Sequence, residues 1–291
     1  MPPYYRSKPL GSAALMLITI GSSCGVAPAT KTTQNSCPWA VTRWRPATLG
    51  DAAFEDRDPL LKDPENPNRV KGPNDLVAIV KSDSLHHPHI YIENVKSGER
   101  RHLIRGSKPR WSPDGSRIAC EVWKSLGRPW MLCVIDVKSG KALEPEIGCL
   151  VDTYRWSPDG RSIAVGGTLY GRSVNVLCWV RLPTGESRML DTLTVFAAYE
   201  DLAWSPDSRV LVVTRVTAVD AEEEATAADL WIFDGEGHRC PLTKTDNLIE
   251  EEPRWINNSD ILITQRPSAS GAHEPSERRV ITVTRASSDG R

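Results

Sequence analysis

The hexapeptide at residues 110–115, Arg-Trp-Ser-Pro-Asp-Gly, recurs along the chain and decides its fold. It returns unchanged at 155–160, and at 203–208 with alanine in the first position and serine in the last. A degenerate copy, Arg-Trp-Ile-Asn-Asn-Ser, occupies 254–259, and Arg69 marks a first copy without the tryptophan. From that arginine position onward, the copies follow at intervals of 41, 45, 48 and 51 residues. Self-similarity at this period indicates stacked supersecondary units, each too small to bury its apolar face alone.

Each copy predicts a set of four short strands. In the copy at 110–115 an extended run ends at Trp111, and Pro-Asp-Gly then forms a tight turn, because proline presets φ and glycine tolerates the left-handed conformation. Apolar segments follow at 117–122 and 130–137, and a second turn leads into a fourth strand. Four strands in about 40 to 50 residues form the blade of a β-propeller. The residues assigned to the repeat itself are Trp111, Asp114, Trp156, Asp159, Trp204, Asp207 and Trp255.

The repeat resembles that of TolB and its relatives, which also occurs in the propeller domains of some serine peptidases. The resemblance rests on Trp-Ser-Pro-Asp-Gly followed by an apolar strand, and it covers residues 69–291. It implies an all-β propeller of four-stranded blades. It implies little about function, because the repeated residues form turns and packing contacts. The chain departs from TolB in that the stretch before residue 69 is too short for an additional α/β domain.

The predicted propeller has five blades by direct count, or six if residues 45–68 contain a divergent one. The last unit contains only three strands before Arg291, which would leave an unpaired edge. The segment Trp39–Trp44 alternates apolar and polar residues, as a half-buried strand does. We therefore expect residues 30–68 to contain a strand that closes the ring, followed by an irregular, proline-rich connection to the propeller at 69–291.

Residues 1–29 are typical of a secretory signal, with a positively charged start, a short apolar run at 10–20 and small residues after it. The apolar run is too short for a membrane-spanning helix. Residues 20–25 resemble a bacterial lipoprotein processing site with Cys24 as the lipidated residue, although a glycine stands where leucine is usual. Ordinary cleavage after Ala29 is the alternative. Both predict an exported protein, either anchored to a membrane through a lipid at Cys24 or free in the periplasm or outside the cell.

With Cys24 lipidated, an even number of cysteines remains, which suits disulfide bonds in an exported protein. The sequence leaves their connectivity open. Cys120 and Cys133 are expected on adjacent strands near cross-strand register, and buried unpaired thiols are the alternative. The cysteines concerned are Cys37, Cys120, Cys133, Cys149, Cys178 and Cys240.

The predicted strand order places short, uniform turns at one end of the blades and variable loops at the other, which favours binding through the variable loops. Acidic residues with aromatic neighbours there suit a basic protein segment, whereas ordinary solvated loop surface is the alternative. The leading hypothesis is a non-catalytic scaffold of the cell envelope, or a secreted one, that binds a protein or peptide partner. The alternative is an enzyme acting on a glycan, as a hydrolase or lyase, with carboxylates as acid and base. The candidate binding residues are Tyr170, Phe196, Tyr199, Asp220, Glu222, Glu223, Glu224, Glu250, Glu251 and Glu252.

Other function classes find little support in the sequence. A net charge of −1 argues against a nucleic-acid-binding protein. No catalytic residue, cofactor or metal is expected, because phosphate-binding glycine loops and His-Glu-x-x-His are absent. Residues 21–25 match Gly-x-Ser-x-Gly only formally, since they lie in the export signal. The histidines at 86, 87 and 89 show no carboxylate or cysteine spaced to complete a metal site.

Arginine precedes the repeat tryptophan position in four of the five units. Such arginines could surround a central channel and bind an anion, or each could pair with a nearby acidic residue and serve the repeat. The structural role is the preferred interpretation. The arginines are Arg69, Arg110, Arg155 and Arg254.

Overall fold

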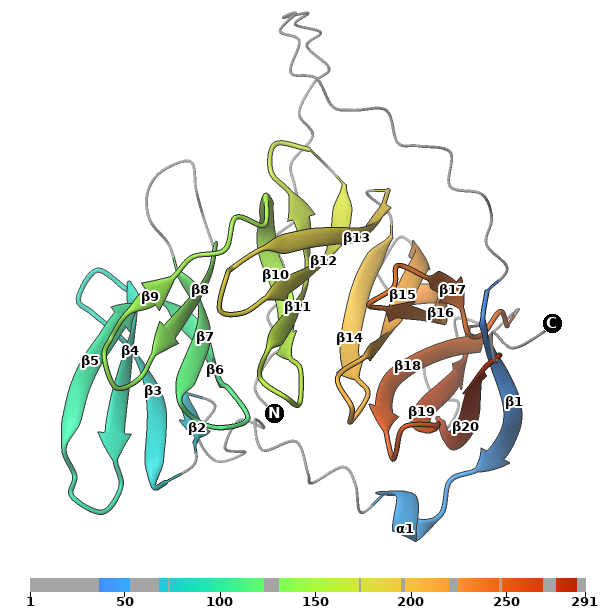
Figure 1. Cartoon of the computed structure of the whole chain (residues 1–291), viewed down its shortest axis with the longest axis horizontal. Helices are drawn as coiled ribbons and strands as arrows, with labels where there is room; N and C mark the ends of the chain where they lie inside the picture. Colours follow the sequence, from blue (N-terminus) through green and yellow to red (C-terminus); the bar gives the residue numbers. More distant parts are fainter. Residues whose placement is uncertain are drawn as a thin grey trace, which may run out of the picture. The chain divides into compact units, whose positions relative to one another are not determined.

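The computed structural model (Figure 1) describes residues 37–52, 68–72, 74–122, 131–172, 174–194, 197–219, 225–245, 248–268 and 276–286. Within them the chain is built almost entirely of strands, with α1 (Leu49–Ala52) as a single helical turn. The strands form five groups of four antiparallel strands, called units 1 to 5 in chain order. Units 1 to 3 are separate sheets, whereas units 4 and 5 are joined by one parallel pairing of Ala228 with Ile249.

Units 1 to 3 are continuous in sequence. Unit 1 contains β2 (Arg69–Lys71), β3 (Leu76–Ser82), β4 (Pro88–Asn94) and β5 (Arg100–Arg105); unit 2 contains β6 (Ser107–Trp111), β7 (Arg117–Val122), β8 (Met131–Asp136) and β9 (Ala142–Leu143); unit 3 contains β10 (Cys149–Trp156), β11 (Ser162–Leu169), β12 (Asn175–Arg181) and β13 (Ser187–Leu193).

Unit 5 takes its fourth strand from the start of the described chain. Unit 4 contains β14 (Ala198–Trp204), β15 (Val210–Val219), β16 (Ala225–Asp234) and β17 (Arg239–Pro241); unit 5 contains β18 (Leu248–Trp255), β19 (Asp260–Pro267), β20 (Glu277–Arg285) and β1 (Trp39–Pro46).

The predicted all-β architecture of four-stranded units is therefore confirmed. The number of blades in the whole chain and the closure of a ring stay predictions. Residues 53–67, where most of a sixth blade would fall, lie outside the described residues, as do residues 1–36 with the proposed signal and Cys24. No helix in the described part of the chain is long and apolar enough to cross a membrane.

The repeated turn is held by its own side chains. Ser112 Oγ donates a hydrogen bond to Asp114 Oδ1 at 2.6 Å and accepts one from the Arg117 backbone N–H at 2.9 Å. Gly115 adopts a φ of 68°, in the left-handed region that glycine favours. Units 3 and 4 repeat the serine–aspartate bond at the same length. These bonds explain why the pentapeptide joins two strands so regularly.

The repeat tryptophans connect each unit to the one before it. Trp156 Nε1 donates to the carbonyl of Arg110 at 3.1 Å, and Trp204 Nε1 donates to the carbonyl of Arg155 at 3.2 Å. The equivalent bond of Trp111 joins unit 2 to unit 1, and that of Trp255 joins unit 5 to unit 4. Each bond satisfies a buried donor and fixes the first strands of consecutive units against each other.

The hydrophobic core is divided among the interfaces between units. Four buried clusters each combine apolar side chains of two consecutive units. One such cluster lies between units 1 and 2, and the others lie between units 2 and 3, units 3 and 4, and units 4 and 5. The last cluster also includes Trp39 and Val41 of β1. A unit therefore buries its apolar faces only by packing against its neighbours, as the repeat period predicts.

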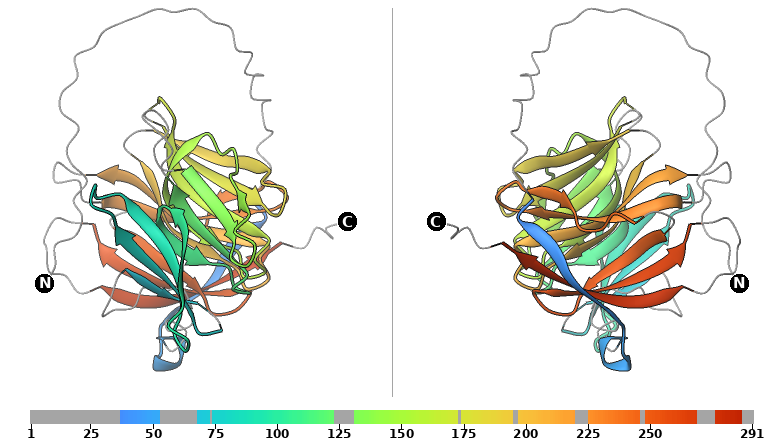
Figure 2. Two further views of the ribbon diagram at one scale, coloured as in Figure 1. Left: turned by 90° about the vertical axis from the view of Figure 1, so that its left-hand side faces the viewer. Right: turned by 90° about the vertical axis from the view of Figure 1, so that its right-hand side faces the viewer.

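Strand β1 pairs with β20 although the two are far apart in sequence (Figure 2). The register matches Trp39 with Arg285 and Trp44 with Ile281. A disulfide joins Cys37, just before β1, to Cys240 in β17. The expected pairing of Trp39–Trp44 with the last unit is thus present, and the disulfide ties the same segment to unit 4.

The remaining described cysteines are free thiols on buried strands. Cys120 and Cys133 lie directly opposite each other on β7 and β8, in the register that the sequence predicts. Cys149 and Cys178 come from β10 and β12 of unit 3. All four are buried.

Candidate functional site

The first strand of each of units 2 to 5 has an irregularity in its pairing with the second strand. The pairing register shifts between Ser107 and Arg110 in β6, and at the corresponding places in β10, β14 and β18. Lys108 and Glu252, at two of these bulges, adopt positive φ values of 49° and 54°. Bulges redirect side chains and often occur beside binding sites. The charged residues at or next to the bulges are Lys108, Asp152, Glu200, Asp201, Glu251 and Glu252.

Four of these carboxylates gather where β14 and β18 adjoin, and we call Glu200, Asp201, Glu251 and Glu252 the acidic cluster. Asp201 Oδ2 accepts a hydrogen bond from the Glu252 backbone N–H at 3.0 Å. Glu251 pairs with Arg266 Nε at 3.2 Å. The cluster lies in the middle of both strands, because Glu200 and Asp201 are the third and fourth of the seven residues of β14, and Glu251 and Glu252 are the fourth and fifth of the eight residues of β18.

The electrostatics of the acidic cluster follow from partial burial and crowding. Burial raises the pKa of Glu200, and the neighbouring carboxylates of Asp201 and Glu251 raise it further. Burial also raises the pKa of Glu251, and the guanidinium of Arg266 only partly opposes this effect. Both carboxyl groups would therefore become easier to ionise if a cation approached them.

A second group of charged residues lies in units 2 and 3, at and near the bulges of β6 and β10. Lys108 Nζ lies 2.8 Å from Glu121 Oε1, and Lys108 also favours the ionised form of Asp152. Burial nevertheless raises the pKa of both Glu121 and Asp152. The charged group of units 2 and 3 thus contains both a lysine and carboxylates, whereas the acidic cluster of units 4 and 5 contains carboxylates only.

The structure places the expected binding residues in different environments. Glu251 and Glu252 belong to the acidic cluster, and Tyr170 is 53% exposed in the turn after β11. Glu250 is fully buried, where it accepts a hydrogen bond from Gln265 Nε2 at 2.9 Å, because successive strand residues point to opposite faces. Phe196, Asp220, Glu222, Glu223 and Glu224 lie outside the described residues.

Tyr199 also differs from the sequence-based expectation. It is only 6% exposed and belongs to the apolar cluster between units 3 and 4. Its burial raises the pKa of the phenol. The residues Tyr199 and Glu250 therefore do not form part of an accessible binding surface.

The sequence analysis missed Asp152, Glu200 and Asp201. A signal for two of them was present, because Asp152, Glu200 and Glu251 each stand four residues before a repeat tryptophan. That alignment identifies an acidic position within the repeat of units 3 to 5. Only the structure shows that the bulges bring the members from β14 and β18 together.

The repeat arginines have structural contacts. Arg69 Nη2 lies 3.5 Å from Glu93 Oε1, and the guanidinium of Arg110 lies 5.5 Å from the centroid of the Tyr154 ring. These contacts favour the interpretation that such arginines serve the repeat.

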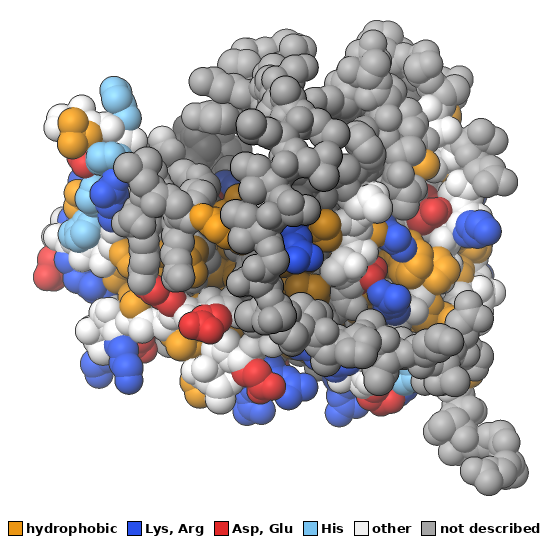
Figure 3. Space-filling view, turned by 90° about the horizontal axis from the view of Figure 1, so that it is seen from above, with side chains coloured by type: hydrophobic (Ala, Val, Ile, Leu, Met, Phe, Trp, Pro, Cys, Tyr) orange, Lys and Arg blue, Asp and Glu red, His pale blue; other side chains and the backbone are white. Residues whose placement is uncertain are grey.

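Histidine side chains gather over unit 1, where Figure 3 shows them in pale blue. Asp83 lies at the centre of this group, 3.3 Å from His87 Nδ1 and 3.4 Å from His89 Nε2, while His89 Nδ1 lies 2.9 Å from His102 Nε2. Hydrogen bonds from the backbone N–H groups of His87 and Leu85 lower the pKa of Asp83 to about 2. Asp83, which the sequence does not single out, thus contacts two of these histidines, and the absence of a metal site among them stays an expectation.

A metal-like arrangement occurs elsewhere among the described residues. Asp234, Glu236 and His238 bring one ligand atom each within 4.8 Å of one another. However, Arg285 already pairs with Glu236 at 2.6 Å and lies 3.7 Å from Asp234. Its guanidinium supplies the positive charge there, so these residues form an ion-pair network.

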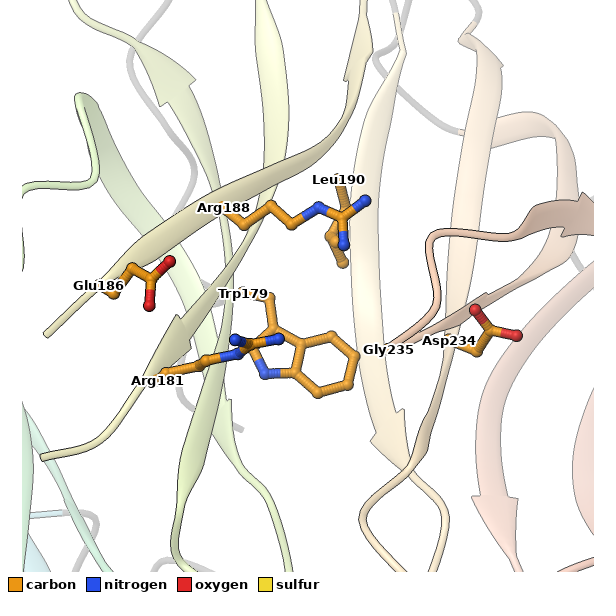
Figure 4. Close-up of a pocket in the computed structure, with 7 residues that line it drawn as sticks. All are labelled: Trp179, Arg181, Glu186, Arg188, Leu190, Asp234 and Gly235. Carbon is orange, nitrogen blue, oxygen red and sulfur yellow. The ribbon is translucent and has the colours of Figure 1, made fainter. Parts of the chain in front are cut away.

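A pocket of about 220 Å³ lies between units 3 and 4 (Figure 4). Arg181 and Glu186 flank the turn between β12 and β13, where the Arg181 N–H donates to the Glu186 carbonyl at 2.8 Å. Asp234 and Gly235 belong to the turn between β16 and β17. Both are short turns, so the pocket lies at the short-turn end of the units, whereas the acidic cluster lies midway along the first strands. Its lining residues are Trp179, Arg181, Glu186, Arg188, Leu190, Asp234 and Gly235.

No protein-family model and no curated protein sequence matches the chain. Among solved structures, the β-propeller domain of the Trilobed protease from Pyrococcus furiosus is similar over 71% of this chain and 65% of its own, with a TM-score of 0.53 and 19% identity. An acylaminoacyl peptidase from Pyrococcus horikoshii is similar over 72% of this chain and 37% of its own, with a TM-score of 0.53 and 16% identity. A putative TolB from Agrobacterium tumefaciens is similar over 61% of this chain and 65% of its own, with a TM-score of 0.45 and 19% identity.

The first two likenesses show a β-propeller fold. The chain spans less than two thirds of the length of each of these three proteins. The resemblance to TolB is a resemblance of the repeat sequence.

Proposed function

We propose that the protein is an exported, non-catalytic β-propeller that binds a basic segment of a protein or peptide partner through carboxylates of its first strands. The observation that carries this proposal is the acidic cluster, where β14 and β18 bring four carboxylates together and Arg266 pairs with one of them. Glu200 and Glu252 are exposed, so a partner can reach them. Burial and the neighbouring carboxylates raise the pKa of Glu200, and lysine or arginine side chains of a partner would oppose this effect by stabilising the ionised form.

Export is supported by an observation independent of the leader sequence. The disulfide between Cys37 and Cys240 joins segments 203 residues apart. Such bonds form and persist mainly in oxidising compartments. Lipid attachment at Cys24 remains part of the proposal, as does the location of the protein at a membrane.

A capture experiment tests the proposed binding. The mature protein is immobilised, incubated with solubilised membranes, and washed with increasing salt. A partner held by the acidic cluster should elute as the ionic strength rises, because exposed charges are screened within about 8 Å at physiological ionic strength. A lysine-rich peptide should compete with it.

The matched variants make the result specific. Glu251→Gln combined with Glu252→Gln should weaken binding of the lysine-rich peptide at least tenfold. Glu99→Gln combined with Glu146→Gln removes the same charge at exposed positions elsewhere and should leave binding unchanged. Equal binding by wild type and the first variant would refute the proposal, and so would an equal loss in the control.

The glycan-active enzyme remains the second candidate, because one observation favours it. Glu200 and Glu251 are neighbouring carboxyl groups whose pKa values are both raised, which is a property of a general acid. Cleavage of a glycan by the wild-type protein, abolished by Glu200→Gln and by Glu251→Gln, would support the enzyme and replace the scaffold.

A further inference from the structure

The pocket between units 3 and 4 contains two arginine side chains whose charge is not neutralised. Arg181 ends β12 and Arg188 lies on β13, and Figure 4 shows both beside the indole of Trp179. Within the described residues, neither guanidinium forms an ion pair or a hydrogen bond. Unpaired arginines that share one concave site are a feature of anion recognition.

One of the two acidic residues in the pocket lining already has other partners. The Asp234 carboxylate accepts a hydrogen bond from Trp39 Nε1 at 3.3 Å and lies 2.9 Å from His238 Nδ1. Arg285 lies 3.7 Å from the same carboxylate. Glu186 is the other acidic residue in the lining, and it forms no ion pair with either pocket arginine.

Trp179 forms a fixed wall of the pocket and adds a donor. Its ring meets Trp204 edge to face, with centroids 4.5 Å apart and planes at 87°. Its Nε1 is shielded from solvent and has no hydrogen-bond partner among the described residues. A buried donor without a partner is uncommon in proteins and indicates a bound group or water.

Arg188 lies beside the turn between β16 and β17. Gly237 has a φ of 102°, and a Cβ added to it would lie 2.7 Å from Arg188 Nη2. The guanidinium of Arg188 is therefore close to this turn of unit 4.

We propose that this pocket binds a small organic carboxylate. The planar guanidinium groups of Arg181 and Arg188 match a carboxylate geometrically and can bind both of its oxygens. Trp179 and Leu190 provide apolar surface for a compact carbon skeleton. A volume of about 220 Å³ suits a molecule the size of one sugar acid or one amino-acid derivative, because drug-sized ligands occupy about 300–1,000 Å³.

This site is independent of the acidic cluster. The two involve different strands and share no residue. A failure of either proposal therefore leaves the other intact.

Calorimetric titration of the mature protein tests the inference. The probes are sodium glucuronate, N-acetyl-aspartate and inorganic phosphate. At least one carboxylate should bind saturably in the millimolar range or tighter, raise the thermal unfolding midpoint, and bind more tightly than phosphate. No saturable binding by either carboxylate would overturn the proposal, and stronger binding of phosphate would replace it with a general oxyanion site.

Variants assign the binding to this pocket. Arg181→Gln combined with Arg188→Gln should weaken carboxylate binding at least tenfold. Arg161→Gln, an exposed arginine of the same unit outside the pocket, should bind as the wild type does. Trp179→Phe keeps an aromatic wall and removes the N–H, so it should weaken binding without lowering the unfolding midpoint of the free protein by more than a few degrees. An equal loss in Arg161→Gln, or unchanged affinity in the double variant, would refute the assignment.

Discussion

Trp156 stabilises the contact between units 2 and 3 in two ways. Its indole N–H donates to the carbonyl of Arg110, and its ring lies in the apolar cluster that the two units share. The guanidinium of Arg117 lies 5.3 Å from the centroid of the same ring. Truncation removes the apolar contact and leaves the Arg110 carbonyl without its partner.

We therefore predict that Trp156→Ala lowers the free energy of unfolding by about 3–5 kcal/mol, as large truncations in protein cores do. Urea denaturation of wild type and variant measures the difference. Tyr170→Ala removes an exposed aromatic side chain from the next turn and should change stability by about 0.5 kcal/mol or less. A loss below about 1 kcal/mol for Trp156→Ala would show that this tryptophan is not a packing residue.

Asp234 makes stability depend on pH. Burial alone would raise the pKa of its carboxyl group, but hydrogen bonds from His238 and Trp39 outweigh burial, and the pKa lies below its ordinary value of 3.8. The unfolded chain therefore binds this proton more readily than the folded one. The stabilisation by Asp234 is complete above about pH 5 and is lost as the pH falls below 3.8 towards the folded-state pKa.

Asp234→Asn should lower stability at pH 7 and should lose less further stability than the wild type between pH 5 and pH 3. Urea midpoints measured across this range test the difference. Glu99→Gln, at an exposed position with no contact to Asp234, should keep the pH profile of the wild type. Parallel profiles for wild type and Asp234→Asn would contradict the predicted role.

Among the strands and turns, the sequence predicted the features that depend on residues close together in the chain. Pro-Asp-Gly specified the turns because its hydrogen bonds form within five residues, and the alternation in Trp39–Trp44 identified a strand that pairs with β20. The bulges in β6, β10, β14 and β18 were not predictable, since they arise where first strands of neighbouring units meet. Glu250 and Tyr199 were misplaced because the sequence does not show which face of a first strand is buried.

Strand β1 should stabilise unit 5 although it is remote in sequence. Its pairing with β20 satisfies backbone groups that would otherwise form an open edge. Deletion of residues 30–45 removes the strand and the cysteine that bonds to Cys240. Amide hydrogen exchange should then become faster across Val280–Thr284 and change less across β8 of unit 2.

A second variant separates the strand from the disulfide. Cys37→Ser combined with Cys240→Ser keeps β1 but removes the covalent link. Exchange across Val280–Thr284 should rise less in this variant than in the deletion. Unchanged protection of β20 in the deletion would show that β1 is dispensable for unit 5.

In the molecule as a whole, the residues of the repeat stabilise the fold, and the residues that could bind a partner lie at other positions. Serine, aspartate and tryptophan of the repeat form the turns and the contacts between units, and they occur in the same roles from unit to unit. Charge that could bind a partner lies outside these positions, with carboxylates midway along the first strands of units 4 and 5 and arginines near a short turn of unit 3. A sequence can reveal the first set by its periodicity. The second set requires coordinates, because Trp179, Arg181 and Arg188 belong to one unit but form a site only against a turn of the next.

The location of the molecule gives the last prediction. Residues 20–25 resemble a lipoprotein processing site, and the disulfide between Cys37 and Cys240 suits an oxidising compartment. If Cys24 carries the lipid, Cys24→Ala should move the protein from the membrane fraction to the soluble fraction or leave the precursor unprocessed. Fractionation with mass spectrometry of the amino terminus measures both outcomes. The variant should still form the Cys37–Cys240 bond if it is exported, because that bond depends on the compartment and not on the anchor. A wild-type mature chain that begins at Thr30 would contradict lipidation while leaving export and the disulfide intact.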